Sequence, residues 1–324
     1  MIKVGIVGYG NLGRGVELNL KDIDDMELVG VFSRRSGIKT VSGVASYSMN
    51  ELENFVNKID VMILCGGSMN DLKEQSVMVA KLFNIVDSFD NHALVNEHYT
   101  AVDVVAKKSK KIGIVSVGWD PGLFSLNRMI STAILPNSKN YTFWGRGVSQ
   151  GHSDAIRRIK GVKDAKQYTL PSQTALNDVR NGKLVELSTR QKHTRECFVV
   201  LENDIPSERQ RVEREIKTMP NYFEPYDTTV NFISQSMLDK NHAGLPHGGV
   251  VITSGITGEN NKQIYEFSLN LDSNPEFTSS IMIAFARAAV RLEKMGESGA
   301  RSIFEIAPYL ISSENLTNLR KNLL

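Results

Sequence analysis

Cysteine is scarce in this sequence, and long apolar runs are absent. Only two of the 324 residues are cysteines, Cys65 and Cys197, and neither lies in a CxxC pair or at a Cys/His spacing typical of zinc sites. We therefore expect two buried thiols, no disulfide framework and no metal site. No apolar stretch approaches the ~18 residues that a membrane-spanning helix requires, so we expect no membrane association.

Neither sign of charge is in excess. The chain has 38 Lys and Arg residues against 36 Asp and Glu residues, a net charge of +2. So small a net charge provides no basic field to attract nucleic acid or an anionic membrane, and neither is expected as a partner. An apolar strand is expected from Ile2 onward, with no signal or transit peptide before it, which favours a cytoplasmic location. A length of 324 residues favours two domains.

The most informative segment is a glycine loop between an expected strand at residues 2–7 and an expected helix at residues 14–21. Gly8, Gly10 and Gly13 follow the GxGxxG spacing of dinucleotide-binding loops. In such loops the glycines permit a tight turn, close approach of the backbone to the pyrophosphate, and close packing of helix on strand. We expect a cofactor at the helix N-terminus, contacted by Gly8, Tyr9, Gly10, Asn11, Leu12 and Gly13. A glycine-rich turn without a ligand is the alternative.

A second expected strand, at residues 26–32, ends in Ser33, Arg34 and Arg35. In NAD-binding proteins an acidic residue about 20 residues past the glycine loop binds the ribose 2′-hydroxyl, whereas arginine accommodates the 2′-phosphate of NADP. No acidic residue ends this strand, and two guanidinium groups suit a phosphate. We therefore expect NADP as the cofactor. A solvated turn that happens to contain two arginines is the alternative.

Short apolar strands alternate with helical segments over the first third of the chain, which predicts a parallel sheet with right-handed crossovers. We expect an α/β fold, a Rossmann-type doubly wound parallel sheet with a second, α+β domain. Ligands of such sheets bind beyond the carboxyl ends of the strands. The residues expected there are those of the glycine loop, Ser33, Arg34, Arg35, Cys65, Gly66, Gly67, Ser68, Asp90, Trp119 and Asp120.

The pattern changes after Asp120. A helix with proline in its first turn is followed by strand-like segments, several with no helix between them, which favours antiparallel pairing. We expect a dinucleotide-binding domain at residues 1–120 and a domain for substrate binding and dimerisation at residues 121–274. The last segment, residues 275–324, has helical spacing and is expected to pack back on the first domain.

Three segments of the second domain carry groups suited to binding a ligand. The loop at residues 143–153 has glycines whose backbone N–H groups are accessible to an anion, although a flexible surface loop has the same composition. Arg195 lies at the edge of an expected strand, where its guanidinium could bind a carboxylate in bidentate fashion; a surface ion pair is the alternative. His247 lies in a tight turn, as a ligand or as a structural histidine.

Several longer motifs together resemble the meso-diaminopimelate dehydrogenases, and the likeness covers the whole chain. The motifs are GYGNLGRG at residues 8–15, FSRR at 32–35, SFDNH at 88–92, GWDPGLFS at 118–125, FWGRGVSQGHSDA at 143–155, LPHGG at 245–249 and LDSNPEF at 271–277. The resemblance implies reversible, NADP-dependent oxidative deamination of the D-centre of meso-2,6-diaminopimelate to L-2-amino-6-oxopimelate and ammonia. It also implies a role in lysine and diaminopimelate biosynthesis, and a homodimer.

The resemblance further implies roles for individual residues. Asp90 and Asp120 would lie near the amine that reacts. The rest of the substrate would be contacted by Trp119 and Trp144 as walls of the pocket, the backbone of Gln150 and Gly151 at the reacting carboxylate, and Thr169, Arg195, His247 and Asn274 at the distal L-centre. The cofactor would be bordered by Cys65, Gly66, Gly67 and Ser68.

Oxidation of an amine is consistent with two aspartates. The reaction needs a neutral amine, a hydride path to the nicotinamide and a water that attacks the iminium, so a carboxylate must accept protons at the reacting carbon. Two other functions stay open. One is a different NADP-linked reductase of amino-acid biosynthesis, acting on a semialdehyde or a dihydropicolinate, because a fold does not determine a substrate. The other is a non-catalytic NADP-binding sensor.

Overall fold

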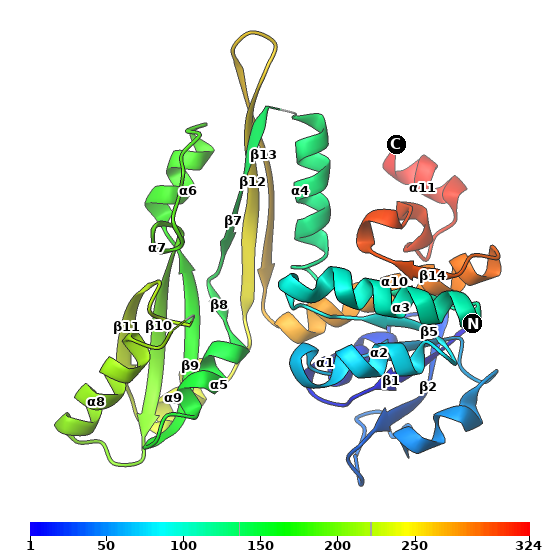
Figure 1. Ribbon diagram of the computed structural model, residues 1–324, viewed down its shortest axis with the longest axis horizontal. Coiled ribbons are helices and arrows are strands. Elements are labelled where there is room, and N and C mark those ends of the chain that lie inside the picture. Colours follow the sequence, from blue (N-terminus) through cyan, green and yellow to red (C-terminus); the bar gives the residue numbers. More distant parts are fainter. Residues whose placement is uncertain (136, 221) are drawn as a thin grey trace. The chain divides into compact units, whose positions relative to one another are not determined.

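The structure is a computed structural model that describes residues 1–135, 137–220 and 222–324. The chain divides into two compact units (Figure 1). The first comprises Met1–Leu126 and Pro275–Leu324, and the second comprises Asn127–Asn274. The C-terminal segment therefore belongs to the same unit as the glycine loop.

The first unit is built on a seven-stranded parallel sheet with the strand order β14-β6-β5-β4-β1-β2-β3. Its strands are β1 (Ile2–Val7), β2 (Met26–Ser33), β3 (Ser46–Ser48), β4 (Val61–Leu64), β5 (Asn84–Asp87), β6 (Ile112–Ile114) and β14 (Gly299–Arg301). The order reverses between β1 and β4, which is the switch point at which doubly wound sheets bind ligands. The predicted Rossmann-type parallel sheet is confirmed.

Helices and turns connect these strands. They are α1 (Asn11–Leu20), η1 (Met49–Phe55), η2 (Ser68–Leu72), α2 (Lys73–Val79), η3 (His92–Leu94), α3 (Val95–Ser109), α10 (Asn274–Lys294), η4 (Ile303–Glu305), η5 (Pro308–Leu310) and α11 (Leu316–Leu323). The C-terminal segment is not helical throughout, because β14 joins the sheet after α10. A strand of three residues is too short for its alternation to be recognised in the sequence.

Aromatic side chains anchor the strand ends of this unit. Phe32, Phe83 and Phe89 are each no more than 1% exposed, and burial of one such side chain contributes about 1.5–3 kcal/mol. Phe32 precedes Ser33, and Phe89 precedes Asp90. The core therefore fixes the points from which two of the candidate functional loops begin.

The second unit contains two sheets (Figure 1), one with the order β11-β10-β9-β8 and one with the order β13-β12-β7. The strands are β7 (Ser138–Trp144), β8 (Gly147–Val148), β9 (Val162–Pro171), β10 (His193–Leu201), β11 (Asp227–Phe232), β12 (His247–Thr257) and β13 (Asn261–Leu271). Antiparallel pairing holds for these strands except β10 and β11, which pair in parallel. The helix between β10 and β11 supplies the crossover that a parallel pair requires.

The helices of this unit are α4 (Leu123–Ile134, which begins in the first unit), α5 (Gln150–Arg157), α6 (Gln173–Arg180), α7 (Thr189–Lys192), α8 (Pro206–Lys217) and α9 (Gln235–His242). Ile156 of α5 and Val212 and Ile216 of α8 form one apolar cluster with Cys197 of β10. Arg195 lies two residues before Cys197 and so points to the same face of the sheet. The face of this sheet that α5 and α8 cover is therefore apolar at Cys197 and polar at Arg195.

Candidate functional site

The glycine loop has the geometry of a dinucleotide site. Gly8 has φ +89°, and a Cβ at Gly13 would lie 2.2 Å from the Gly8 carbonyl oxygen, so both positions require glycine. Gly10 is the N-cap of α1, and a Cβ there would meet no atom within 4 Å. Asn11 and Leu12 begin the helix. Because the first N–H groups of a helix lack partners within it, this turn can receive an anion.

Tyr9 links the glycine loop to the end of β2. Its carbonyl oxygen accepts a 2.7 Å hydrogen bond from the Arg35 guanidinium, and its hydroxyl donates to Glu17. The backbone N–H of Arg35 in turn donates a 3.0 Å hydrogen bond to the Ser33 hydroxyl. The predicted cofactor residues at the ends of β1 and β2 therefore lie together.

A cavity with a basic lining lies at this point, bordered by Tyr9, Arg14, Arg35, Ser36, Gly37, Ile38, Lys39 and Val41. Three cationic side chains around one cavity suit a phosphate group. Arg34 is not among the lining residues; its side chain is 67% exposed and pairs with Asp71. Sequence reasoning missed Arg14 and Lys39 because neither lies at the end of a strand.

The turn after β4 lies at the switch point of the sheet. The Cys65 N–H donates a 2.8 Å hydrogen bond to the Val7 carbonyl oxygen, which extends the pairing of β4 with β1. The Gly67 N–H donates a 3.0 Å hydrogen bond to the Asp71 carboxylate, and a Cβ at Gly66 would lie 2.7 Å from the Asp71 Cβ. The turn is thus held tightly against the start of the following helix.

Asp90, the first candidate catalytic residue, is exposed and follows β5. Its backbone N–H donates a 2.9 Å hydrogen bond to the hydroxyl of Ser68. Ser68 begins η2, just beyond the turn after β4. This contact brings together a residue predicted for the cofactor and a residue predicted for catalysis, at the carboxyl edge of one sheet.

Asp120, the second candidate, lies in a tight turn after β6. The peptide bond that follows it is cis, and Gly122 has φ +133°. A Cβ at Gly122 would lie 1.7 Å from the Gly118 carbonyl oxygen, so the turn requires glycine there. Trp119 is 7% exposed and packs edge-on against Phe124, with ring centroids 5.2 Å apart. The Trp119 side chain is therefore held in place beside Asp120.

A buried carboxylate that sequence reasoning missed joins the loops of both aspartates. Asp87 is fully buried, and its carboxylate accepts hydrogen bonds from the N–H groups of Phe89 at 3.1 Å and Ser116 at 2.9 Å. The Ser76 hydroxyl donates to it at 2.7 Å, and the ring of His98 lies 2.7 Å away. Because Phe89 and Ser116 begin the two loops, Asp87 fixes their relative positions.

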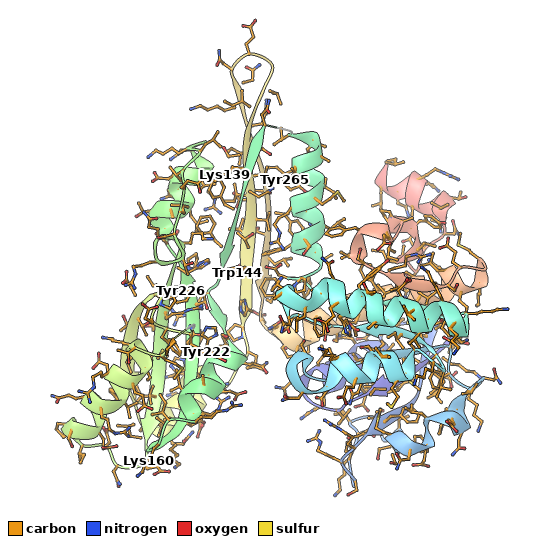
Figure 2. All side chains as sticks on the ribbon, in the orientation of Figure 1. Lys139, Trp144, Lys160, Tyr222, Tyr226 and Tyr265 are labelled. Atoms are coloured by element: carbon orange, nitrogen blue, oxygen red, sulfur yellow. The ribbon has the colours of Figure 1, made fainter. Side chains whose placement is uncertain are left out.

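Arg195 is the centre of the candidate site in the second unit. Gly147, Thr169, Arg195 and Thr228 are register partners across β8, β9, β10 and β11. The Arg195 side chain donates to the Thr169 hydroxyl, and its guanidinium lies 3.9 Å from the centroid of the Tyr226 ring. Figure 2 labels Tyr226 beside the four-stranded sheet. Arg195 is 7% exposed, and burial lowers its pKa.

Several buried polar atoms without hydrogen-bond partners lie on Arg195 and on the strands next to it. No ion pair among the described residues involves Arg195, and its buried Nε has no hydrogen-bond partner. The same holds for the Thr228 hydroxyl and for both amide atoms of Gln167, which is fully buried. Gln167 lies two residues from Thr169 and therefore on the same face of β9. Buried polar groups require partners, so this region is suited to an anionic, hydrogen-bonding ligand.

Trp144, at the end of β7 (Figure 2), is held by a histidine. Its backbone N–H donates a 2.8 Å hydrogen bond to His193 Nε2, and the two rings stack with centroids 5.2 Å apart. Burial, together with the charge of Arg195, lowers the pKa of His193 to about 3. His193 is therefore a neutral acceptor at physiological pH, a role that its place at the start of β10 did not reveal in the sequence.

The remaining predicted residues lie at the ends of elements. The His247 ring packs on Gly147, where a Cβ would lie 2.4 Å from His247 Nδ1, and that nitrogen accepts a 2.8 Å hydrogen bond from the Gly248 N–H. Gln150 and Gly151 begin α5, and a Cβ at Gly151 would meet no atom within 4 Å. The Asn274 N–H donates a 3.0 Å hydrogen bond to the Leu245 carbonyl oxygen, next to the LPHGG turn.

The described residues contain neither a cluster of metal-ligating side chains nor a membrane-spanning helix. Over residues 1–135, 137–220 and 222–324, no group of three or more His, Cys, Asp or Glu side chains could hold a metal ion. Over the same ranges, no helix is long and apolar enough to cross a membrane.

Comparison with known proteins identifies the family. A model of the diaminopimelic acid dehydrogenase C-terminal domain matches residues 118–273. The chain is 57% identical to the meso-diaminopimelate D-dehydrogenase of Lysinibacillus sphaericus, over 100% of this chain and 99% of the relative. It is 46% identical to that of Corynebacterium glutamicum, over 98% of each. The chain belongs to the meso-diaminopimelate dehydrogenase family. The resemblance inferred from its motifs is confirmed.

Solved structures similar to this family member share its fold. C. glutamicum DAP dehydrogenase in complex with DAP has a TM-score of 0.92 and 45% identity, covering 100% of this chain and 99% of that one. An engineered D-amino acid dehydrogenase bound to NADP⁺ has a TM-score of 0.87 and 43% identity, with the same coverage. The chain is therefore an amino-acid dehydrogenase with a nicotinamide cofactor and a small-molecule substrate. Neither a reductase acting on a semialdehyde or a dihydropicolinate nor a non-catalytic NADP-binding sensor is favoured.

Proposed function

We propose that this diaminopimelate dehydrogenase family member catalyses the NADP-dependent oxidative deamination of the D-centre of meso-2,6-diaminopimelate. The substrate, water and NADP⁺ give L-2-amino-6-oxopimelate (the open form of tetrahydrodipicolinate), ammonium, NADPH and a proton, reversibly. The observation that carries the proposal is the buried guanidinium of Arg195, which has no ion-pair partner among the described residues. A diacid substrate supplies the missing carboxylate, and the relatives are named for such a substrate.

NADP rather than NAD is the proposed cofactor. The support is the cavity lined by Arg14, Arg35 and Lys39, together with the NADP⁺ bound to an engineered dehydrogenase of similar fold. When bound, NADP accepts the hydride from the reacting carbon. The residues proposed to contact it, beyond Arg14 and Lys39, are Gly8, Tyr9, Gly10, Asn11, Leu12, Gly13, Ser33, Arg34, Arg35, Cys65, Gly66, Gly67 and Ser68.

Asp90 and Asp120 are proposed to act at the reacting amine. The two residues follow the neighbouring strands β5 and β6, and the loops that carry them are both tied to Asp87. A carboxylate there accepts the proton of the substrate ammonium, which leaves a neutral amine, and releases that proton to solvent. It then accepts a proton from the water that attacks the iminium carbon and returns it to the nitrogen, which departs as ammonium. Trp119 lies beside Asp120, where its indole limits the access of other water molecules.

The proposed substrate contacts distinguish the two ends of a nearly symmetric molecule. Arg195 and Thr169, with His247 and Asn274, bind the distal L-centre, and bidentate binding of its carboxylate by Arg195 fixes the orientation. The first N–H groups of α5, at Gln150 and Gly151, bind the carboxylate of the reacting centre. Trp144 forms a wall of the pocket. Only the D-centre of a correctly oriented molecule then reaches the nicotinamide.

A homodimer is the proposed assembly. Three apolar residues of α4 are exposed, Met129 by 42%, Ile130 by 38% and Ile134 by 58%. Exposed apolar side chains grouped on one helix are typical of a surface that a second copy covers. Light scattering of the purified protein is expected to give twice the chain mass of 36.0 kDa, and a mass of one chain at micromolar concentration would contradict the proposal.

The stoichiometry of the reaction tests the proposed function. With meso-2,6-diaminopimelate and NADP⁺, we expect one ammonium released for each NADPH formed, measured in the same reaction. In the reverse direction, NADPH oxidation by tetrahydrodipicolinate should require ammonium. NADPH oxidation that proceeds equally well without ammonium would instead identify a reductase that acts on a semialdehyde or a dihydropicolinate.

A further inference from the structure

Glu17 is an unusual residue for the middle of a helix that packs on a sheet. It lies in α1 and is 1% exposed, and no ion pair among the described residues involves it. Its carboxylate instead accepts four hydrogen bonds. One comes from the Tyr9 hydroxyl, one from the Val41 N–H at 3.1 Å, and two from the N–H and hydroxyl of Ser42, at 2.6 and 2.5 Å.

These hydrogen bonds join two segments of the proposed cofactor site. Tyr9 belongs to the glycine loop, whereas Val41 and Ser42 close the segment of residues 36–42 that follows β2. The Val41 N–H also lies 3.0 Å from the Tyr9 hydroxyl, so the three groups form one network around Glu17. We call this network the Glu17 clasp; its members are Tyr9, Glu17, Val41 and Ser42.

The carboxylate of Glu17 stays ionised at physiological pH. Burial raises the pKa of Glu17, but the hydrogen bonds from Ser42, Tyr9 and Val41 outweigh burial and leave the pKa below that of a free glutamate. An ionised acceptor makes stronger hydrogen bonds than a neutral one. A glutamine at this position would fill the same space, but its NH2 group cannot accept a hydrogen bond, so two of the four bonds would be lost and the other two weakened.

The segment that the clasp holds carries much of the basic cavity. Ser36, Lys39 and Val41 line that cavity, and Glu17 does not. Residues 34–45 form no helix or strand, so their position depends on side-chain contacts such as these. Glu17 therefore acts on the cavity through the segment rather than by touching its contents.

We propose that Glu17 is a positioning residue for cofactor selectivity, holding residues 36–42 so that the cavity closes around the 2′-phosphate of NADP. The inference rests on the proposed NADP dependence. NAD lacks that phosphate, so its binding depends less on the position of residues 36–42. Loss of the clasp should therefore weaken NADP binding selectively, whereas a purely structural role of Glu17 would affect both cofactors alike.

Steady-state kinetics of the full-length enzyme with each cofactor test the proposal. The Glu17→Gln variant should have a KM for NADP⁺ raised about tenfold, a KM for NAD⁺ within twofold of the wild type, and a kcat within twofold. Ser42→Ala, which removes one donor and leaves the charge, should shift the same ratio by a smaller factor. Glu53→Gln removes the charge of an exposed glutamate outside the clasp and should change neither constant.

The outcomes separate this inference from the proposed function. Wild-type enzyme that prefers NAD⁺ would contradict the proposed cofactor itself, before any variant is considered. Wild-type enzyme that prefers NADP⁺, with equal changes in both KM values or none in folded Glu17→Gln and Ser42→Ala, would overturn the role of Glu17 alone. If Glu17→Gln does not fold, Ser42→Ala decides the question.

Discussion

The ring Nε2 of His98 lies 2.7 Å from the Asp87 carboxylate, and both side chains are buried beneath the loops that carry Asp90 and Asp120. The same carboxylate accepts the N–H groups with which those loops begin. A charged acceptor shared between two loops makes the position of one depend on the other. The relative positions of Asp90 and Asp120 therefore depend on Asp87 and His98, which do not contact the substrate.

Replacing Asp87 tests this dependence. In Asp87→Asn an amide faces backbone N–H donors, and we expect a loss of about 1–3 kcal/mol in the free energy of unfolding because buried donors lose a charged partner. We also expect a fall in kcat with little change in KM for NADP⁺. Urea unfolding and steady-state kinetics provide the measurements, with exposed Asp22→Asn as the control. Unchanged stability and kcat would show that the two loops are positioned by other contacts.

Arg195 should matter only for substrates that have a distal carboxylate. We expect Arg195→Met to lower kcat/KM for meso-2,6-diaminopimelate by a factor equivalent to about 2–4 kcal/mol, because a charge-assisted pair is lost. Activity with D-alanine, which lacks the distal centre, should change little or improve. Arg214→Met, at an exposed position of α8, is the control. Unaltered kcat/KM and stereoselectivity in Arg195→Met would remove this residue from the site.

Two glycines of the loop should respond differently to alanine. A Cβ at Gly13 would lie 2.2 Å from the Gly8 carbonyl oxygen, so Gly13→Ala should destabilise the fold by about 1–3 kcal/mol through overpacking. A Cβ at Gly10 would meet no protein atom within 4 Å, so Gly10→Ala should keep its Tm and lose cofactor affinity by tenfold or more. Thermal unfolding and titration with NADPH distinguish the two effects. A Gly10→Ala variant with normal affinity would place the pyrophosphate elsewhere.

His193 should make the fold sensitive to acid. Burial lowers its pKa to about 3, whereas an unfolded histidine titrates near 6.5. Between these pH values the unfolded chain binds a proton that the folded chain excludes, so this residue's contribution to stability is complete above about pH 6.5 and is lost as pH falls toward 3. The slope is at most about 1.4 kcal/mol per pH unit.

A matched variant isolates that contribution. Urea unfolding at pH 7 and pH 4.5 should show a smaller difference for His193→Gln, which cannot ionise, than for the wild type. His92→Gln changes an exposed histidine outside this network and should leave the difference unchanged. Equal pH dependence in all three proteins would mean that His193 takes up a proton between pH 7 and pH 4.5 in the folded state, as it does in the unfolded chain.

Local patterns in the sequence were sufficient for the parts of the site that follow strand ends. Gly8, Gly10 and Gly13 have a spacing set by the turn itself, and Arg35 lies two residues past the end of β2. The sequence therefore predicted the structure at these positions. Antiparallel pairing was expected for strands with no helix between them, and β12 and β13, which have none, pair in this way. β10 and β11, which α8 separates, pair in parallel, and the sequence alone did not predict which strand would pair with β10 across that helix.

The residues that the sequence did not reveal act across long separations. Glu17 accepts from Ser42, and Asp87 accepts from Ser116, at separations of 25 and 29 residues. An acidic residue in a helix or at the end of a short strand has no periodic signal that marks it as buried. Gln167 is similar: nothing in its neighbours along β9 indicates that both of its amide atoms are buried without partners. Such roles arise only once the strands are paired.

Absorbance at the reduced-nicotinamide band tests the proposed substrate and the proposed cofactor in one experiment. The enzyme is mixed with NADP⁺ or NAD⁺ and, separately, with meso-, LL- or DD-2,6-diaminopimelate or D-alanine. We expect rapid reduction of NADP⁺ with the meso isomer, far exceeding that with any other substrate or with NAD⁺. No reduction with any of the amino acids, from a folded protein that binds NADPH, would contradict it.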